Sequence, residues 1–224
     1  YMSDDKTQQS KRLKLNMQNT TVAYGEWSGV FRRTPSGRPL DCTAADLNGD
    51  GYSELIVAYL TKDADLIAES GRNPGHLYIY VEMFDGKTLF DANSGDAVSY
   101  ASRLNLYTTG DLYGHEDNFM PSQVRITKAD FDSDGVMEFP VAFSSEKSQN
   151  LALVKYNKSS NSIEKAIDVK AIANLYNNPE RYTTEGMDIT VGDFDGNGSD
   201  EIMVVYGTYS GAVREHDSEN RLKF

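Results

Sequence analysis

Short apolar runs recur along the chain and are separated by polar, glycine-rich segments. The runs include "LIVAYL" at 55–60, "HLYIYVEMF" at 76–84 and "LALVKY" at 151–156. Runs of this length, rich in β-branched and aromatic residues, are typical of strands and are too short for amphipathic helices. The pattern therefore predicts an all-β protein. Pro140 lies inside one predicted strand and lacks an N–H, so we expect a gap or bulge in the ladder there.

Three of the predicted strands follow the same acidic loop. The segments "CTAADLNGDGYSELIVAY" (42–59), "ITKADFDSDGVMEFPVAF" (126–143) and "ITVGDFDGNGSDEIMVVY" (189–206) align without a gap. Counted from the first acid of each loop, position 6 is always glycine, position 9 glutamate, position 12 valine and position 14 aromatic. Such a regular recurrence indicates an internal structural repeat.

Each loop carries oxygen-bearing residues at alternate positions, as a calcium loop does. The opening D-x-[DN]-x-[DN]-G matches an EF-hand, but valine stands at position 12 where an EF-hand needs a bidentate glutamate. Glutamate at position 9 and the apolar run after it indicate a loop that joins two strands, with the glutamate folding back. The alternative, an acidic hairpin turn in which Asp, Asn and Gly only form the turn, leaves the glutamate unexplained.

The candidate ligands occupy positions 1, 3, 5, 7 and 9 of each loop, with a backbone carbonyl at position 7. They predict about three Ca²⁺ ions with six or seven ligands each. The middle loop has four carboxylates and the outer loops three, so we expect the middle loop to bind most tightly. The fifteen residues are Asp46, Asn48, Asp50, Tyr52 and Glu54; Asp130, Asp132, Asp134, Val136 and Glu138; and Asp193, Asp195, Asn197, Ser199 and Glu201.

The loops, their following strands and the spacing of about 63 residues between Asp130 and Asp193 resemble the FG-GAP/VCBS repeat family. The best-known members of that family are the seven-bladed propellers of integrin α subunits. The resemblance implies β-propeller blades of four antiparallel strands, with a calcium-binding loop between the first two strands of each blade. The chain has glutamate at position 9, where aspartate is more usual in the family, and it lacks the FG and GAP landmarks.

On this interpretation residues 1–224 form a single propeller segment. We expect residues 1–40 to be the tail of a preceding blade, 41–124 a blade with two insertions, 125–187 a blade and 188–224 an incomplete one. The insertions are predicted at 61–75 and 110–121. Because such blades bury their faces against neighbours, we expect further blades from the same longer chain or from a partner chain.

The net charge of −12 argues against nucleic acid as a partner. The chain contains no apolar run long enough for membrane insertion, and its one cysteine, Cys42, excludes an intrachain disulfide and a thiolate zinc cluster. Calcium modules of this kind bind at about 10⁻⁴ to 10⁻³ M, a concentration found outside cells. We therefore expect a secreted or cell-surface protein.

Catalytic motifs are absent from the sequence, and His76, His115 and His216 are scattered without a nucleophile beside them. The sequence favours a protein that is not an enzyme, namely a scaffold for recognition or adhesion with a protein or glycan ligand. Alternatives are the non-catalytic propeller portion of a larger secreted enzyme or toxin, and a carbohydrate-binding lectin. The triplet 115–117, His-Glu-Asp, could hold a metal or a sugar, but a solvated surface loop is the stronger interpretation.

Overall fold

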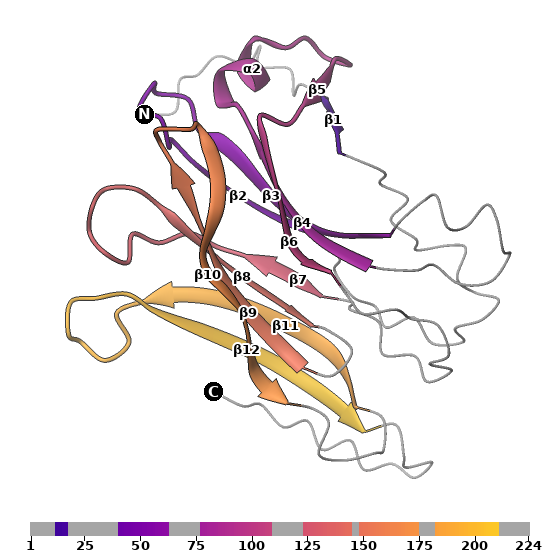
Figure 1. The fold of residues 1–224 in the computed structure, drawn as a ribbon, viewed down its shortest axis with the longest axis vertical. Helices are drawn as coiled ribbons and strands as arrows, with labels where there is room; N and C mark the ends of the chain where they lie inside the picture. The colour runs from indigo at the N-terminus through magenta and orange to yellow at the C-terminus, as the bar shows by residue number, and fades with distance from the viewer. Residues whose placement is uncertain are drawn as a thin grey trace, which may run out of the picture.

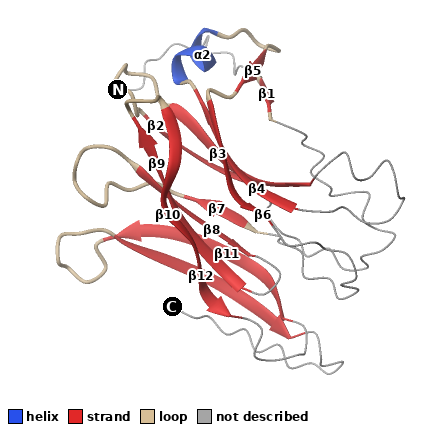
Figure 2. Cartoon of the chain, viewed as in Figure 1, coloured by secondary structure: helices blue, strands red, loops and turns tan. Residues whose placement is uncertain are grey.

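The computed structural model describes residues 12–17, 40–62, 77–108, 123–144, 148–174 and 182–210. Strands dominate these ranges, as expected for an all-β chain, and the helix within them is the short α2, Gly86–Asp91 (Figure 2). In this part of the chain no helix is long and apolar enough to cross a membrane. The triplet at 115–117 and most of the two expected insertions lie outside the described residues.

The first sheet is antiparallel and follows the chain in the order β2-β3-β4-β6. Its strands are β2 (Leu40–Ala45), β3 (Glu54–Lys62), β4 (Leu77–Phe84) and β6 (Ser102–Thr108). Ile56 and Ala58 of β3 are buried on one face, and Val57 and Tyr59 on the other. Burial on both faces is why this strand reads as an unbroken apolar run.

The second sheet repeats this arrangement, with the order β7-β8-β9-β10. Its strands are β7 (Val124–Ile126), β8 (Glu138–Ser144), β9 (Ser148–Asn157) and β10 (Ser162–Asn174). Pro140 pairs in register with Leu153 of β9, but the ladder to β7 stops at Ile126 and resumes as an isolated bridge between Ala129 and Glu138. The expected interruption at Pro140 is therefore present, on the side of β7.

Two smaller sheets complete the described structure. Strands β11 (Tyr182–Gly192) and β12 (Glu201–Ser210) form an antiparallel pair around the third loop. Strand β1 (Lys14–Asn16) pairs in parallel with β5 (Ala97–Ser99), which lies between β4 and β6 in sequence. None of the described sheets closes on itself.

The first sheet, the second sheet and the β11–β12 pair stack face to face in chain order (Figure 1). One core cluster lies between the first and second sheets and includes Ile56, Val81, Phe139 and Val154. A second cluster joins Ala142 of the second sheet to apolar residues of β11 and β12. The second sheet is thus covered on both faces, which accounts for the burial of every residue of β8.

The strands that enter the three loops contact one another through equivalent positions. Lys128 donates through Nζ to the carbonyl oxygen of Ala44, and both residues stand two before the first acid of their loops. Arg125 and Asp188, each five before its own first acid, approach to 4.0 Å between Nε and Oδ1. Positions that are equivalent in the repeat therefore lie next to one another in successive units.

Candidate metal centres

Each acidic loop connects the first two strands of its sheet, and all three turn in the same way. The glycine at position 6 has a φ of 88°, 84° or 89° in the three loops, which is the left-handed region that glycine adopts without strain. Position 4 is also left-handed, and there Gly49 and Gly196 are matched by Ser133 with a φ of 57°. The shared backbone shape follows from these two positions.

Three hydrogen bonds recur in all three loops and hold this shape. The side chain at position 1 accepts from the amide of glycine 6, at 3.0, 2.9 and 2.9 Å in chain order. The side chain at position 3 accepts from the amide of position 5, at 2.8, 3.2 and 3.0 Å. The side chain at position 5 accepts from the amide of position 7, at 2.8, 2.7 and 2.8 Å. The oxygen side chains at 1, 3 and 5 are thereby oriented by the loop itself.

The glutamate at position 9 folds back onto the start of its loop, as the sequence predicted. Its Oε2 accepts from the amide of position 2 at 2.8 Å in Glu54, 2.9 Å in Glu138 and 2.9 Å in Glu201. Glu54 is only 2% exposed and Glu138 only 8%. Neither forms an ion pair in the described part of the chain, so each is a buried carboxylate held by hydrogen bonds alone.

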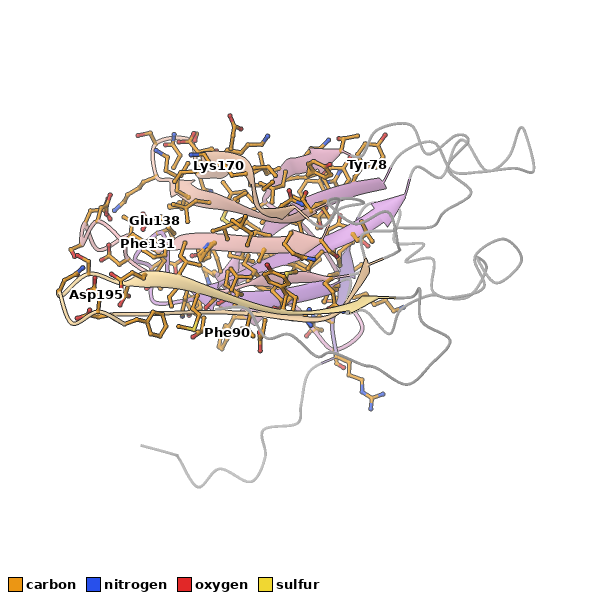
Figure 3. The ribbon with its side chains drawn as sticks, turned by 90° about the horizontal axis from the view of Figure 1, so that it is seen from below. Tyr78, Phe90, Phe131, Glu138, Lys170 and Asp195 are labelled. Atoms are coloured by element: carbon orange, nitrogen blue, oxygen red, sulfur yellow. The ribbon has the colours of Figure 1, made fainter. Side chains whose placement is uncertain are left out.

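The loops bring carboxylates together in three groups, each with oxygens within 4.8 Å of one another. The groups are Asp50, Glu54 and Asp85; Asp130, Asp132 and Glu138; and Asp193, Asp195 and Glu201. The predicted ligands Asp46 and Asp134 lie outside these tight groups. Asp46 accepts from the amides of Gly49 and Gly51, and Asp134 accepts from that of Val136. Figure 3 shows Glu138 and Asp195 at the same end of the molecule.

Asp85 was missed by sequence reasoning. It directly follows β4 and therefore lies far in sequence from the loop whose carboxylates it joins. Only the antiparallel pairing of Leu55 with Phe84 brings the end of β4 beside the start of β3. An acid directly after a predicted strand that neighbours a calcium loop was the available signal.

The loops differ in what faces the glutamate at position 9. Asn48 donates through Nδ2 to Asp50 and Glu54, at 3.2 Å each, and so places a partial positive charge between two carboxylates. Asn197 similarly donates to Glu201 at 3.5 Å. In the middle loop the residues at these two positions, 3 and 5, are Asp132 and Asp134, which can only accept. Burial, and then repulsion from Asp132, Asp134 and Asp130, raise the pKa of Glu138, against the lowering effect of the Phe131 amide.

The donor set fits a hard cation. The loop positions offer carboxylate and amide oxygens and contain no histidine or thiolate, which suits Ca²⁺ better than zinc or copper. Position 7, occupied by Tyr52, Val136 and Ser199, presents its amide to the side chain at position 5, and the ligand role of its carbonyl stays a prediction.

No protein-family model and no curated protein matches this chain. The case for its function therefore depends on the residues and geometry described above.

Proposed function

We propose that the chain is a calcium-binding segment of a β-propeller, in which about three Ca²⁺ ions brace the turns between strands. The side chains at positions 1, 3, 5 and 9 and the carbonyl at position 7 of each loop would hold the ions. Oε2 of the glutamate accepts from the amide of position 2 in each loop, and Oε1 also accepts from Asn48 in the first loop and from Asn197 in the third. Binding of the metal through Oε1 would therefore displace the side-chain amide in the two outer loops.

The observation that carries this proposal is the buried glutamate at position 9 of the first two loops. A buried carboxylate among other carboxylates is costly unless a cation compensates its charge. No lysine or arginine of the described chain pairs with Glu54 or Glu138. A divalent ion bound by the surrounding oxygens would supply the missing charge.

The propeller part of the proposal is supported by the repetition of the units. Two four-stranded antiparallel sheets and a further antiparallel pair stack in chain order and meet through equivalent positions. This is the relation expected of successive blades around one axis. We assign blades to 41–124 and 125–187, an incomplete one to 188–224 and the tail of another to 1–40. Further blades would come from the same longer chain or a partner chain.

We assign this segment to a secreted or cell-surface protein that acts as a recognition or adhesion scaffold and not as an enzyme. Calcium sites of this kind fill at extracellular concentrations, and the residues of the loops are committed to metal. The ligand would be another protein or a glycan, and glycan-array binding by the isolated chain distinguishes these. The rival hypothesis, a non-catalytic portion of a larger secreted enzyme or toxin, predicts a catalytic domain in the flanking sequence.

Calorimetric titration of the chelator-stripped chain with Ca²⁺ tests the metal assignment. We expect about three sites that saturate with millimolar Ca²⁺ and bind Mg²⁺ more weakly, because Mg²⁺ demands a smaller octahedral shell. The matched control carries Asp132→Asn and Glu138→Gln and should lose one site. If the titration shows no binding of Ca²⁺ up to millimolar concentrations, the proposal is refuted.

A further inference from the structure

Helix α2 packs directly against the first acidic loop. A Cβ atom added to Gly86, the first residue of the helix, would lie 2.4 Å from the carbonyl oxygen of Ser53 and 2.9 Å from the carbonyl carbon of Tyr52. Real Cβ atoms do not approach backbone so closely, so glycine is what allows the helix to begin here. The helix start and positions 7 and 8 of the loop therefore form one packed unit.

Side chains extend this contact along the helix. The rings of Tyr52 and Phe90 lie 5.1 Å apart between centroids, in a tilted arrangement. Lys87 places Nζ 5.4 Å from the centroid of the Tyr52 ring. Distances of this order are typical of aromatic pairs and of cation–π contacts. Tyr52, a residue of the loop, thus contacts two residues of α2.

Asp85 connects the helix to the carboxylates of the loop. Its Oδ1 accepts from the amide of Thr88 at 2.7 Å and caps the helix. A carboxylate oxygen of the same residue lies within 4.8 Å of oxygens of Asp50 and Glu54. Glu54 is 2% exposed and has no cationic partner among the described residues. A third acid beside this buried charge is unfavourable unless a cation lies among them.

We propose that the first calcium site has two parts, the loop Asp46–Glu54 and the helix cap Asp85, and that calcium bound there holds α2 in place. This inference rests on the proposed function. In the second sheet the corresponding connection between β9 and β10 is the short turn 158–161, which carries no acid. Of the two sheets whose corresponding connection the structure describes, only the first would have a composite site, and the first loop would then have four carboxylates, as many as the middle loop. The third loop, with three, should then be the weakest.

The coupling extends beyond the helix. The segment after α2 leads to β5, which pairs with β1, and Val98 of β5 packs with Val57 and Tyr59 against the outer face of the first sheet. Since binding energy is reciprocal between coupled elements, calcium at the first loop should stabilise the docking of 86–99, and loss of that docking should weaken calcium binding.

Terbium provides a site-specific probe, because Tb³⁺ replaces Ca²⁺ and is sensitised by a nearby tyrosine, which only the first loop carries at position 7. The luminescence lost in Tyr52→Phe is assigned to the first loop. The test variant is Asp85→Asn, which removes the charge and keeps a good helix cap. The matched control is Asp91→Asn, which removes an equal charge from the exposed end of the same helix.

We expect Asp85→Asn to weaken the Ca²⁺ affinity of the first loop, measured by competition with Tb³⁺, by about tenfold, because ligand charge count tunes affinity. Asp91→Asn should change the same affinity by less than about twofold. Amide hydrogen exchange in 86–91 should slow on addition of Ca²⁺ in the wild type and in Asp91→Asn, and much less in Asp85→Asn. Equal affinities for the two variants, with calcium bound normally at all loops, would overturn this inference alone. Failure of every loop to bind calcium would overturn the proposed function with it.

Discussion

At the scale of single residues, the loops depend on backbone conformations that most residues avoid. Gly135 has a φ of 84°, and a Cβ added to it would meet no atom within 4 Å. The cost of a side chain at this position is therefore one of backbone conformation and not of space. Gly192 offers the opposite case, since its φ is not left-handed and an added Cβ would make ordinary contacts with Phe194.

We expect Gly135→Ala to destabilise the protein by about 1–2 kcal/mol, the cost of the left-handed conformation for an L-residue. For a chain of this size that corresponds to a fall in melting temperature of about 2–4 °C per kcal/mol, measurable by calorimetry. Gly192→Ala is the control and should leave the melting temperature unchanged or slightly higher. An equal fall for both variants would show that the loop conformation is not the cause.

The raised pKa of Glu138 predicts opposite effects of pH with and without calcium. The pKa of Glu138 is raised above its ordinary value of 4.5, so the folded metal-free protein holds this proton more tightly than the unfolded chain does. Its contribution to stability is present at low pH and is lost as pH rises through the raised pKa. Calcium needs the ionised form, so affinity at the middle loop should fall as pH decreases through the same range.

Thermal unfolding between pH 4 and 7 measures how stability depends on pH, and calcium titration over the same range measures how affinity depends on pH. The difference between wild type and Glu138→Gln isolates the contribution of this residue from that of the other acids. We expect the variant to lose the pH dependence that belongs to position 138 in each measurement. If wild type and variant keep the same pH profile, Glu138 does not titrate as described.

At the scale of elements, a buried polar group ties three strands of the first sheet together. Glu82 of β4 is fully buried, and its Oε1 accepts from Tyr59 of β3 at 2.9 Å and from Nε and Nη2 of Arg103 of β6 at 2.8 and 2.7 Å. Among the described residues its Oε2 has no hydrogen-bond partner. Burial, and then the bond to Glu82, raise the pKa of Tyr59, which therefore remains a donor.

Removing one partner of this network should lower the free energy of unfolding substantially. Arg103→Leu leaves the buried Glu82 without its counter-ion, and we expect a loss of about 3–5 kcal/mol in the free energy of unfolding. The double variant Glu82→Leu with Arg103→Leu removes both charges and should recover much of that loss. Denaturant unfolding of wild type, both single variants and the double variant gives the coupling energy. Additive effects would contradict the network.

The elements also show what the sequence could and could not predict. The strands after Glu54, Glu138 and Glu201 were predicted because each combines an acidic loop with an apolar run, which are local signals. Helix α2 was not predicted, because six residues between two strands carry no helical period. Asp85 was missed for a related reason, since its proximity to Glu54 depends on the pairing of β3 with β4 and not on spacing along the chain.

At the scale of the whole molecule, calcium is expected to act as a brace. Each loop joins two adjacent strands of one sheet, so strands fix both sides of a site. The described ranges contain no hinged helix pair like that of a sensor EF-hand. Metal that binds only the folded form stabilises it by about 2.7 kcal/mol per site at 100 times the dissociation constant.

Chelation should therefore lower the melting temperature markedly while leaving the far-ultraviolet circular dichroism spectrum at 20 °C unchanged. Glu138→Gln should lower the calcium-dependent part of the stability by roughly one site's share and keep the fold intact. The control is the same variant in chelator, where its effect should be small or stabilising because carboxylate repulsion is relieved. A large reversible rearrangement on chelation, with little change in melting temperature, would indicate a regulatory role instead.

The strand order has a consequence for synthesis of the chain. Each strand of the two four-stranded sheets pairs with strands that are close to it in sequence, so each sheet can form soon after its last strand leaves the ribosome. Strand β1 is different, because Lys14 pairs with Ala97 and must wait until more than eighty further residues have been made. Strand β1, the first of the described strands, is thus among the later ones to find its partner, and until then Leu15, Met17 and Val98 do not cover the apolar outer face of β3.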